Sequence, residues 1–223
     1  MVYAFDNVAR QTYIREVILA LGQLAMMEAS NQTSFYVVGI GLSIGGIDPL
    51  TEILACLPDN SNAAFLIIQH LDRAYPSKLA ARLQPFTKLK VNVAIQGMAI
   101  AFNQVYVLAE GQMMTIEKGK LIVRARRADE TVNKAVDILF YSMAEDLGKR
   151  AISVILSGLD GDGSLGAAQI KLQGGITIAQ LPATAQHPSM PESAIKSGQT
   201  RFILKPQDIA GEITKLTRVK DKH

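Results

Sequence analysis

From Phe35 to the end of the chain, short apolar segments alternate with segments whose apolar residues recur at helical spacing. Parallel strands need a crossover connection, usually a helix, so this alternation is typical of a parallel sheet. The sequence therefore predicts an α/β fold with a doubly wound, mostly parallel sheet. Strands are expected at 35–40, 63–69, 91–95, 151–156, 176–180 and 202–204, and helices at 46–57, 76–84, 133–147, 163–173 and 206–217.

Two regions interrupt this alternation. Between residues 103 and 126 the pattern changes to three short β segments, 104–108, 113–116 and 121–124, with a turn at Glu117-Lys-Gly-Lys120. We expect an antiparallel hairpin inserted on the edge of the sheet. Between the strands at 176–180 and 202–204, a segment with Pro182, Pro188 and Pro191 is expected to be a loop.

The first 34 residues differ from the rest of the chain. Residues 8–29 carry apolar side chains at helical spacing, and Ser30-Asn-Gln-Thr-Ser34 is a polar stretch. We expect an appended amphipathic helix and linker over 1–34, a main domain over 35–217 and a polar tail over 218–223.

Composition narrows the class of protein. With 48% hydrophobic residues the chain can bury a large core, and its net charge is only +3. The basic cluster Arg124-Ala-Arg-Arg127 lacks interleaved aromatic residues, which argues against a nucleic-acid groove. A single cysteine, Cys56, excludes an internal disulfide framework and a cysteine zinc site. No leader pattern and no apolar stretch of ~20 residues is present, so we expect a cytoplasmic protein without membrane insertion.

The most distinctive local motif is the segment Gly39-Ile-Gly-Leu-Ser43-Ile-Gly-Gly46, which follows the first predicted strand. Glycines permit a sharp strand-to-helix turn, so the Ser43 hydroxyl can stand clear at the strand end. The following helix directs its N-terminal amides to the same place. This is how a chain presents a serine nucleophile.

Two further residues have positions that suit a catalytic triad. His70 ends the second predicted strand and Asp162 follows the strand at 151–156. In a parallel sheet these carboxyl ends lie along one edge, with neighbouring strands roughly 4.8 Å apart. His70 can then accept the Ser43 proton, and Asp162 can orient the imidazole.

Each candidate has a structural alternative. The turn around Ser43 is a near miss to a dinucleotide-binding fingerprint, in which Asp72 would meet a ribose. His70 could be a hydrogen-bonded core histidine, and Asp162 could cap the helix that begins near Gly163.

The segment that starts at Asp160 also resembles a calcium loop. Leu165 and Lys171 replace the glycine and glutamate that such a loop needs, so this reading fails and no metal or cofactor is expected. His187, in the proline-bounded loop, is expected to face solvent.

These motifs together resemble the catalytic domain of CheB-type protein-glutamate methylesterases of bacterial chemotaxis, over about Val37 to Ile213. The resemblance rests on Gly-Leu-Ser43-Ile-Gly-Gly, Gln69-His70-Leu71, Val105-Tyr-Val107, Ala135-Val-Asp137-Ile-Leu-Phe140, Val154-Ile-Leu-Ser-Gly158-Leu-Asp-Gly-Asp162-Gly, Ala183-Thr-Ala-Gln186 and Ser189-Met-Pro191-Glu-Ser-Ala-Ile195.

The resemblance implies a serine hydrolase that removes methyl esters from glutamates of chemoreceptor cytoplasmic helices, and often deamidates glutamines there. It implies Ser43 as nucleophile, His70 as base and Asp162 as orienter, with the Leu159 amide as oxyanion donor. A cognate methyltransferase or sensor protein is an expected partner. The segment before Phe35 is too short for the receiver domain that gates many members of the family.

Four positions depart from the family pattern. Ile44 follows the nucleophile in place of threonine or alanine, and Glu192 stands where arginine is common. Leu108-Ala-Glu-Gly111 and Asn133-Lys-Ala135 each lack a usual proline. A second hypothesis is therefore a weakly catalytic module that docks on a receptor or methyltransferase. A third is a nucleotide-binding oxidoreductase that uses the Gly39 to Gly45 turn.

Overall fold

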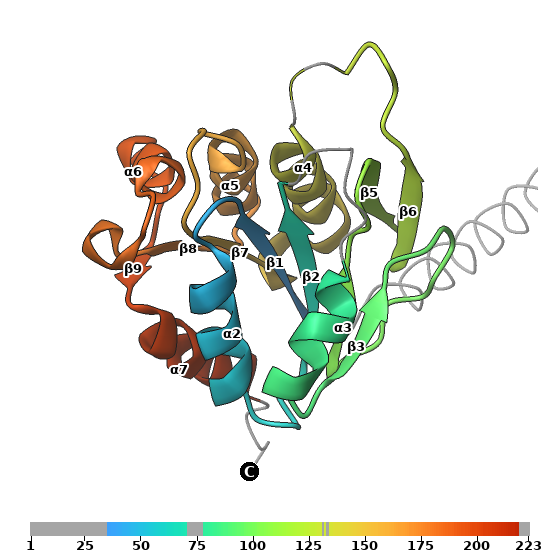
Figure 1. The fold of residues 1–223 in the computed structure, drawn as a ribbon, viewed down its shortest axis with the longest axis horizontal. Coiled ribbons are helices and arrows are strands. Elements are labelled where there is room, and N and C mark those ends of the chain that lie inside the picture. Colours follow the sequence, from blue (N-terminus) through green and yellow to red (C-terminus); the bar gives the residue numbers. More distant parts are fainter. Residues whose placement is uncertain (1–34, 71–77, 131, 133, 219–223) are drawn as a thin grey trace, which may run out of the picture. The chain divides into compact units, whose positions relative to one another are not determined.

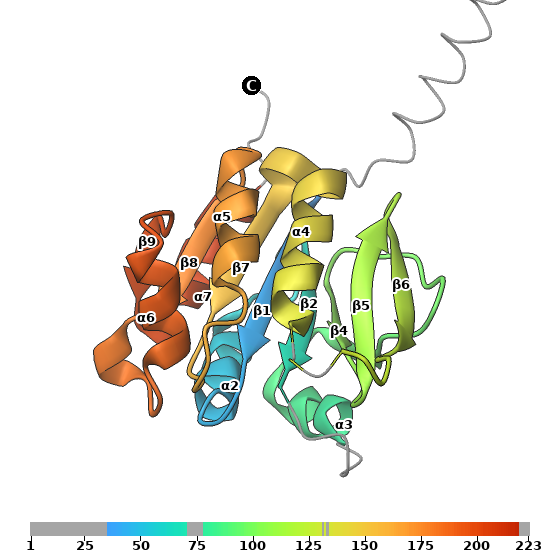
Figure 2. The same cartoon turned by 90° about the horizontal axis from the view of Figure 1, so that it is seen from above.

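The central feature of the fold is a sheet of seven parallel strands in the order β3-β4-β2-β1-β7-β8-β9 (Figure 1 and Figure 2). The computed structural model describes residues 35–70, 78–130, 132 and 134–218. The strands are β1 (Tyr36–Leu42), β2 (Ala63–Gln69), β3 (Lys90–Val93), β4 (Gln104–Val107), β7 (Ala151–Ile155), β8 (Ile176–Gln180) and β9 (Phe202–Leu204). The predicted α/β class with a parallel sheet is confirmed.

Helices cover both faces of this sheet (Figure 2). One buried cluster joins the sheet to α2 (Ile47–Cys56), α3 (Leu79–Leu83) and α7 (Pro206–Thr217), and a second joins it to α4 (Ala135–Leu147), α5 (Ser164–Leu172) and α6 (Ser189–Lys196). Short 3₁₀ helices lie at Gln84–Phe86, Gly148–Arg150 and Pro182–Thr184. Successive residues of β1 alternate between the clusters, with Val37 in one and Val38 in the other, as strand geometry requires. The sheet is therefore doubly wound, as predicted.

The position of β1 determines where a site can form. The chain passes from β1 to β2 on one side, and β7 pairs with β1 on the other side. This reversal of direction is a topological switch point, where ligands bind beyond the carboxyl ends of the strands.

Helix α4 packs closely on β1 at Gly39. A Cβ at this position would lie 2.6 Å from Met143 Sδ and 2.7 Å from Phe140 Cε1. The glycine therefore permits the close approach of the helix to the strand.

We expect Gly39→Ala to lower the free energy of unfolding by about 1–3 kcal/mol, because the methyl group overpacks a filled core. Gly211→Ala is the matched control, since a Cβ there meets nothing within 4 Å and Gly211 lies inside α7. This control should be neutral or more stable by up to about 1 kcal/mol. Urea unfolding of both variants measures the difference, and equal midpoints would contradict the overpacking.

The hairpin consists of β5 (Gln112–Glu117) and β6 (Lys120–Ala125), which are antiparallel. Its two-residue turn, Lys118-Gly119, has positive φ at both positions, as a type I′ turn requires. Both turn amides donate to the Asp146 carboxylate of α4, at 2.6 and 3.1 Å. The side chains of Met113, Met114, Ile116 and Leu121 join the same buried cluster as α4.

The predicted place of the hairpin on the edge of the sheet is wrong, because β5 and β6 form a two-stranded sheet of their own. The segment 104–108, expected beside the hairpin strands, instead contributes β4, which lies between β2 and β3 in the main sheet. Its residues Val105, Tyr106 and Val107 are all buried. A continuous apolar run of this kind is typical of a parallel strand covered on both faces.

The expected loop between β8 and β9 contains a helix that the sequence reading missed, α6. Pro191 lies in its first turn, where a missing N–H costs no helical hydrogen bond. Met190 and Ala194 face the core. The amphipathic helix expected at 8–29 and the tail after Arg218 lie outside the described residues. No described helix is long and apolar enough to cross a bilayer.

Candidate active site

Ser43 begins the turn between β1 and α2, at the switch point of the sheet. Its amide donates to the Ser157 carbonyl oxygen at 2.9 Å, and its own carbonyl accepts from Gly46 N at 3.0 Å. Gly45 has φ +76°, and a Cβ there would collide with Gln186 and with the Ser157 hydroxyl. The turn is thus held by backbone contacts, while the Ser43 hydroxyl has no hydrogen-bond partner among the described residues.

His70 follows β2 at the same level as Ser43. Leu42 pairs with Gln69 in the register of β1 and β2, so Ser43 and His70 are the next residues of adjacent strands. The His70 amide donates to the Leu42 carbonyl oxygen at 2.9 Å. The sheet therefore places the two backbones side by side, as the sequence predicts.

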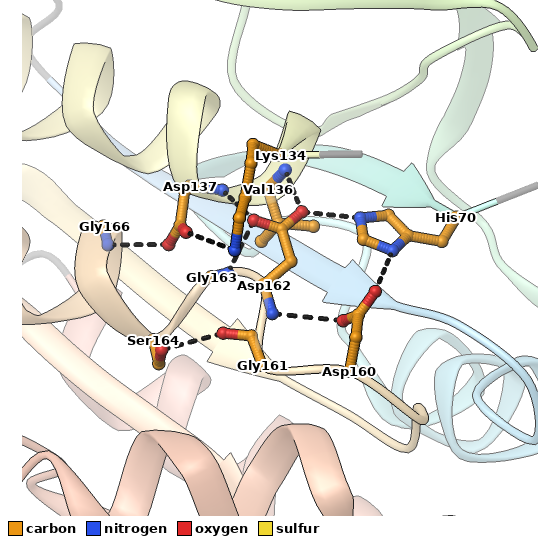
Figure 3. A network of polar contacts seen from close by, with 10 residues as sticks. All are labelled: His70, Lys134, Val136, Asp137, Asp160, Gly161, Asp162, Gly163, Ser164 and Gly166. Carbon is orange, nitrogen blue, oxygen red and sulfur yellow. Dashed lines mark hydrogen bonds and ion pairs between the residues drawn. The ribbon is translucent and has the colours of Figure 1, made fainter. Parts of the chain in front are cut away.

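Asp162 is the buried partner of the imidazole (Figure 3). Its Oδ2 lies 2.5 Å from His70 Nε2 and accepts from Val136 N at 2.9 Å. Its Oδ1 accepts from Asp137 N at 3.0 Å and from Gly163 N at 2.9 Å. The Asp162 side chain is only 1% exposed.

The Asp162 carboxylate therefore also caps a helix. This helix is mainly α4, whereas the sequence suggested α5, which begins near Gly163. Val136 and Asp137 belong to the first turn of α4, whose free amides and dipole favour a negative group. The bond to Gly163 N adds a contact at the start of α5. The Asp162 carboxylate thus both caps α4 and contacts the imidazole of His70.

A second carboxylate, from Asp160, contacts the other ring nitrogen of His70. Asp160 Oδ2 lies 3.0 Å from His70 Nδ1, and its Oδ1 accepts from Asp162 N at 3.1 Å. The sequence does not predict this role, because it shows Asp160 only as part of a calcium-loop pattern. The available signal was the spacing Asp160-Gly-Asp162, which puts two carboxylates on one tight loop after β7.

The two carboxylates set the charge of the imidazole. Burial by itself lowers the pKa of His70, but the hydrogen bonds and charges of Asp160 and Asp162 outweigh it and raise the pKa to about 9. Burial opposes the charged form of Asp160, yet the bond to His70 leaves its pKa below the usual value. At neutral pH His70 is therefore an imidazolium whose two N–H groups both point at carboxylates.

Asp137 lies behind Asp162 and does not touch the imidazole. Its Oδ1 accepts from Gly166 N at 2.9 Å, and its Oδ2 lies 3.7 Å from Lys134 Nζ. Burial and the nearby charge of Asp162 raise the pKa of Asp137 despite the bond from Gly166. Asp137 thus links the site to α4 and α5 (Figure 3).

The loop after β7 borders Ser43 on its other side. A Cβ on Gly158 would lie 2.8 Å from Ser43 Cβ, so the backbone of this loop runs against the serine. Gly158 N donates to the His187 carbonyl oxygen at 2.9 Å, whereas the next amide, Leu159 N, has no acceptor within the described part of the chain. A free amide in this position can donate to a developing oxyanion.

His187 and Ser157 support the turn. The His187 amide donates to Ser157 Oγ at 2.9 Å, and Ser157 Oγ donates to the Ile44 carbonyl oxygen at 3.0 Å. His187 is half-buried, rather than fully solvent-facing as expected, because its backbone forms part of this brace. The fully buried Ser157 is a second residue that motif reasoning missed.

The structure thus brings two of the three predicted side chains into contact. His70 binds Asp162, while Ser43 and His70 are adjacent in the backbone, with no hydrogen bond between their side chains in this arrangement. Asp72, the ribose ligand of the dinucleotide alternative, lies outside the described residues.

Comparison with known proteins gives consistent similarities. A family model described as CheB methylesterase matches residues 38–213. A protein-glutamate methylesterase/protein-glutamine glutaminase of Moorella thermoacetica is 35% identical over 185 residues, covering 81% of this chain and 44% of the relative. A protein of the same description from Burkholderia pseudomallei is 33% identical over 182 residues, covering 81% and 53%. The chain therefore spans about half the length of the curated relatives it matches.

One solved structure extends the similarity to the fold. The crystal structure of the Thermotoga maritima CheB methylesterase catalytic domain is 30% identical, with a TM-score of 0.75. The match covers 82% of this chain and all of the crystallised chain.

Proposed function

Because the chain belongs to the CheB methylesterase family, we propose that it is a serine hydrolase acting on methyl esters of glutamate side chains in chemoreceptor cytoplasmic helices. We include deamidation of glutamine in the proposal, since the relatives are described by both activities. The observation that carries it is the placement of Ser43 beside His70 at paired strand ends, with His70 bound to the buried Asp162.

The proposed reaction follows the acyl-enzyme route. Ser43 Oγ attacks the ester carbonyl as a ring nitrogen of neutral His70 takes its proton, and the Leu159 amide donates to the oxyanion. The imidazolium then returns the proton to the departing methoxide, which leaves as methanol. Water, deprotonated by His70, hydrolyses the acyl-enzyme to the glutamate and regenerates Ser43. Asp162 holds the imidazole orientation throughout.

The rim of the proposed site carries exposed apolar side chains as well as charge. Ile44 is 55% exposed and Leu159 is 57% exposed, so two apolar side chains flank Ser43. Glu192, which stands where the family often has arginine, adds a half-buried carboxylate at the start of α6. We propose that these residues influence which receptor segment is accepted, because rim charges govern encounter and partner choice more than chemistry.

A second candidate function is a docking module for a receptor, methyltransferase or sensor partner. One observation favours it: both ring nitrogens of His70 face carboxylates, so the base is not free in this arrangement. Turnover distinguishes the two functions.

Incubation of the full chain with methyl-labelled receptor cytoplasmic fragments is expected to release labelled methanol, because the proposed site has nucleophile, base and oxyanion donor at one edge of the sheet. The measurement is volatile radioactivity over time, with fragments methylated by methyltransferases of the same organism. The same fragments without the protein give the background rate. A folded protein that never exceeds this background would favour the docking module.

A further inference from the structure

We propose that Asp160 is a positioning residue that restrains the catalytic base: its carboxylate holds the one ring nitrogen of His70 that can serve Ser43, and turnover requires its release. This inference rests on the proposed function, since it concerns the base of that reaction. It assigns a role to a half-exposed side chain outside the triad (Figure 3).

The first step concerns which nitrogen can act as base. A triad uses one ring nitrogen for the orienting carboxylate and the other for the nucleophile. Nε2 of His70 lies 2.5 Å from Asp162, so Nδ1 remains for Ser43. Nδ1 instead faces Asp160 Oδ2 at 3.0 Å. A nitrogen that donates its proton to a carboxylate has no lone pair to accept one from serine.

The second step concerns which carboxylate can move. Asp162 is 1% exposed and accepts from three backbone amides, so its displacement would strand buried donors. The Asp160 side chain is 51% exposed, and its contacts are His70 and the amide of Asp162. Rotation of Asp160 toward solvent would free Nδ1 and leave the bond between His70 and Asp162 intact.

The third step concerns charge. The charged groups near His70 on the described elements are Asp160 and Asp162 of its facing loop, with Asp137 and Lys134 behind them at the start of α4. Two carboxylates in direct contact favour the imidazolium, consistent with a pKa of about 9. The neutral, active form is therefore scarce at neutral pH and increases as pH rises toward that pKa.

The test compares Asp160→Asn with Asp59→Asn. Asparagine keeps an oxygen for the Asp162 amide but removes the charge next to Nδ1. Asp59 is exposed and precedes β2, at the opposite end of that strand from His70, so its replacement removes the same charge far from the site. Asp160→Ala is a second variant, which removes the polar contact of this side chain with Nδ1 and leaves the contact of Asp162 with Nε2 in place.

The imidazole resonances of His70, assigned by their loss in His70→Gln, are titrated by NMR in each protein. We expect His70 to titrate near its pKa of about 9 in the parent and in Asp59→Asn. In both Asp160 variants the pKa of His70 should be lower by about one unit or more, because the negative charge beside Nδ1 is gone. One pKa unit corresponds to a tenfold change in the protonation equilibrium. The pH at which kcat/KM for methanol release rises should be lower by the same amount as the pKa of His70. Turnover at neutral pH should then be about tenfold higher.

The outcomes separate this inference from the proposed function. An unchanged His70 titration in both Asp160 variants would overturn the restraint, as would a lowered pKa without higher turnover at neutral pH in an active enzyme. If the His70 titration shifts as expected but the parent and all variants release no methanol, the contact of Asp160 with the base is upheld and the hydrolase assignment fails.

Discussion

Replacing Ser43 with alanine is expected to lower kcat for methanol release by up to about 10⁶-fold, as removal of the nucleophile does in serine hydrolases. The loss should be nearly purely catalytic. The Ser43 hydroxyl has no hydrogen-bond partner among the described residues, so its removal strands no buried donor. The free energy of unfolding should change by no more than about 0.5 kcal/mol.

A covalent probe gives an independent measurement of the same role. A fluorophosphonate or sulfonyl fluoride should modify Ser43 and no other serine, with the site located by peptide mass mapping. Ser197→Ala, which removes an exposed hydroxyl at the end of α6, is the control and should keep full activity and labelling. Unmodified Ser43 after long exposure, together with undiminished hydrolysis by Ser43→Ala, would rule out the acyl-enzyme route.

The parts of the fold that depend on local pattern could be predicted from the sequence. β2 at Ala63–Gln69 and β8 at Ile176–Gln180 have the predicted bounds, because a covered parallel strand is apolar on both faces and their sequences are nearly continuous apolar runs. The location of the hairpin could not be predicted, since residues 104–107 and 112–117 are similar short β segments that join different sheets. Strand partners are set by long-range packing.

For the candidate site, the sequence could predict which residues lie at neighbouring strand ends, but not the side-chain contacts that depend on loop conformation. The adjacency of Ser43 and His70 follows from strand ends in one parallel sheet, which motif spacing and topology rules already specify. The contact of Asp160 with Nδ1 depends on loop conformation and on the ring rotamer, which residue spacing does not determine. The raised pKa of His70 depends in turn on both carboxylates together with burial, so no single motif carries it.

The second large effect is expected for Asp162→Asn, with turnover lower by up to about 10⁴-fold, because an amide cannot hold the imidazole in the required tautomer. The asparagine oxygen can still accept from Asp137 N and Gly163 N. Its NH₂ group would then face Val136 N and His70 Nε2, two groups that now donate to a carboxylate oxygen. We expect a loss of about 1–2 kcal/mol in unfolding free energy from the weakened α4 cap.

Asp137→Asn separates the catalytic from the structural contribution. Asp137 is buried next to Asp162, and burial raises its pKa, so replacement by the isosteric neutral amide is a conservative change. It makes no contact with the imidazole among the described residues, and its replacement should leave turnover within about tenfold of the parent while perturbing α4 and α5. Steady-state kinetics and urea unfolding of both variants decide the matter. If Asp162→Asn loses stability but less than tenfold in turnover, Asp162 is a helix cap, and the orientation of His70 must come from Asp160 instead.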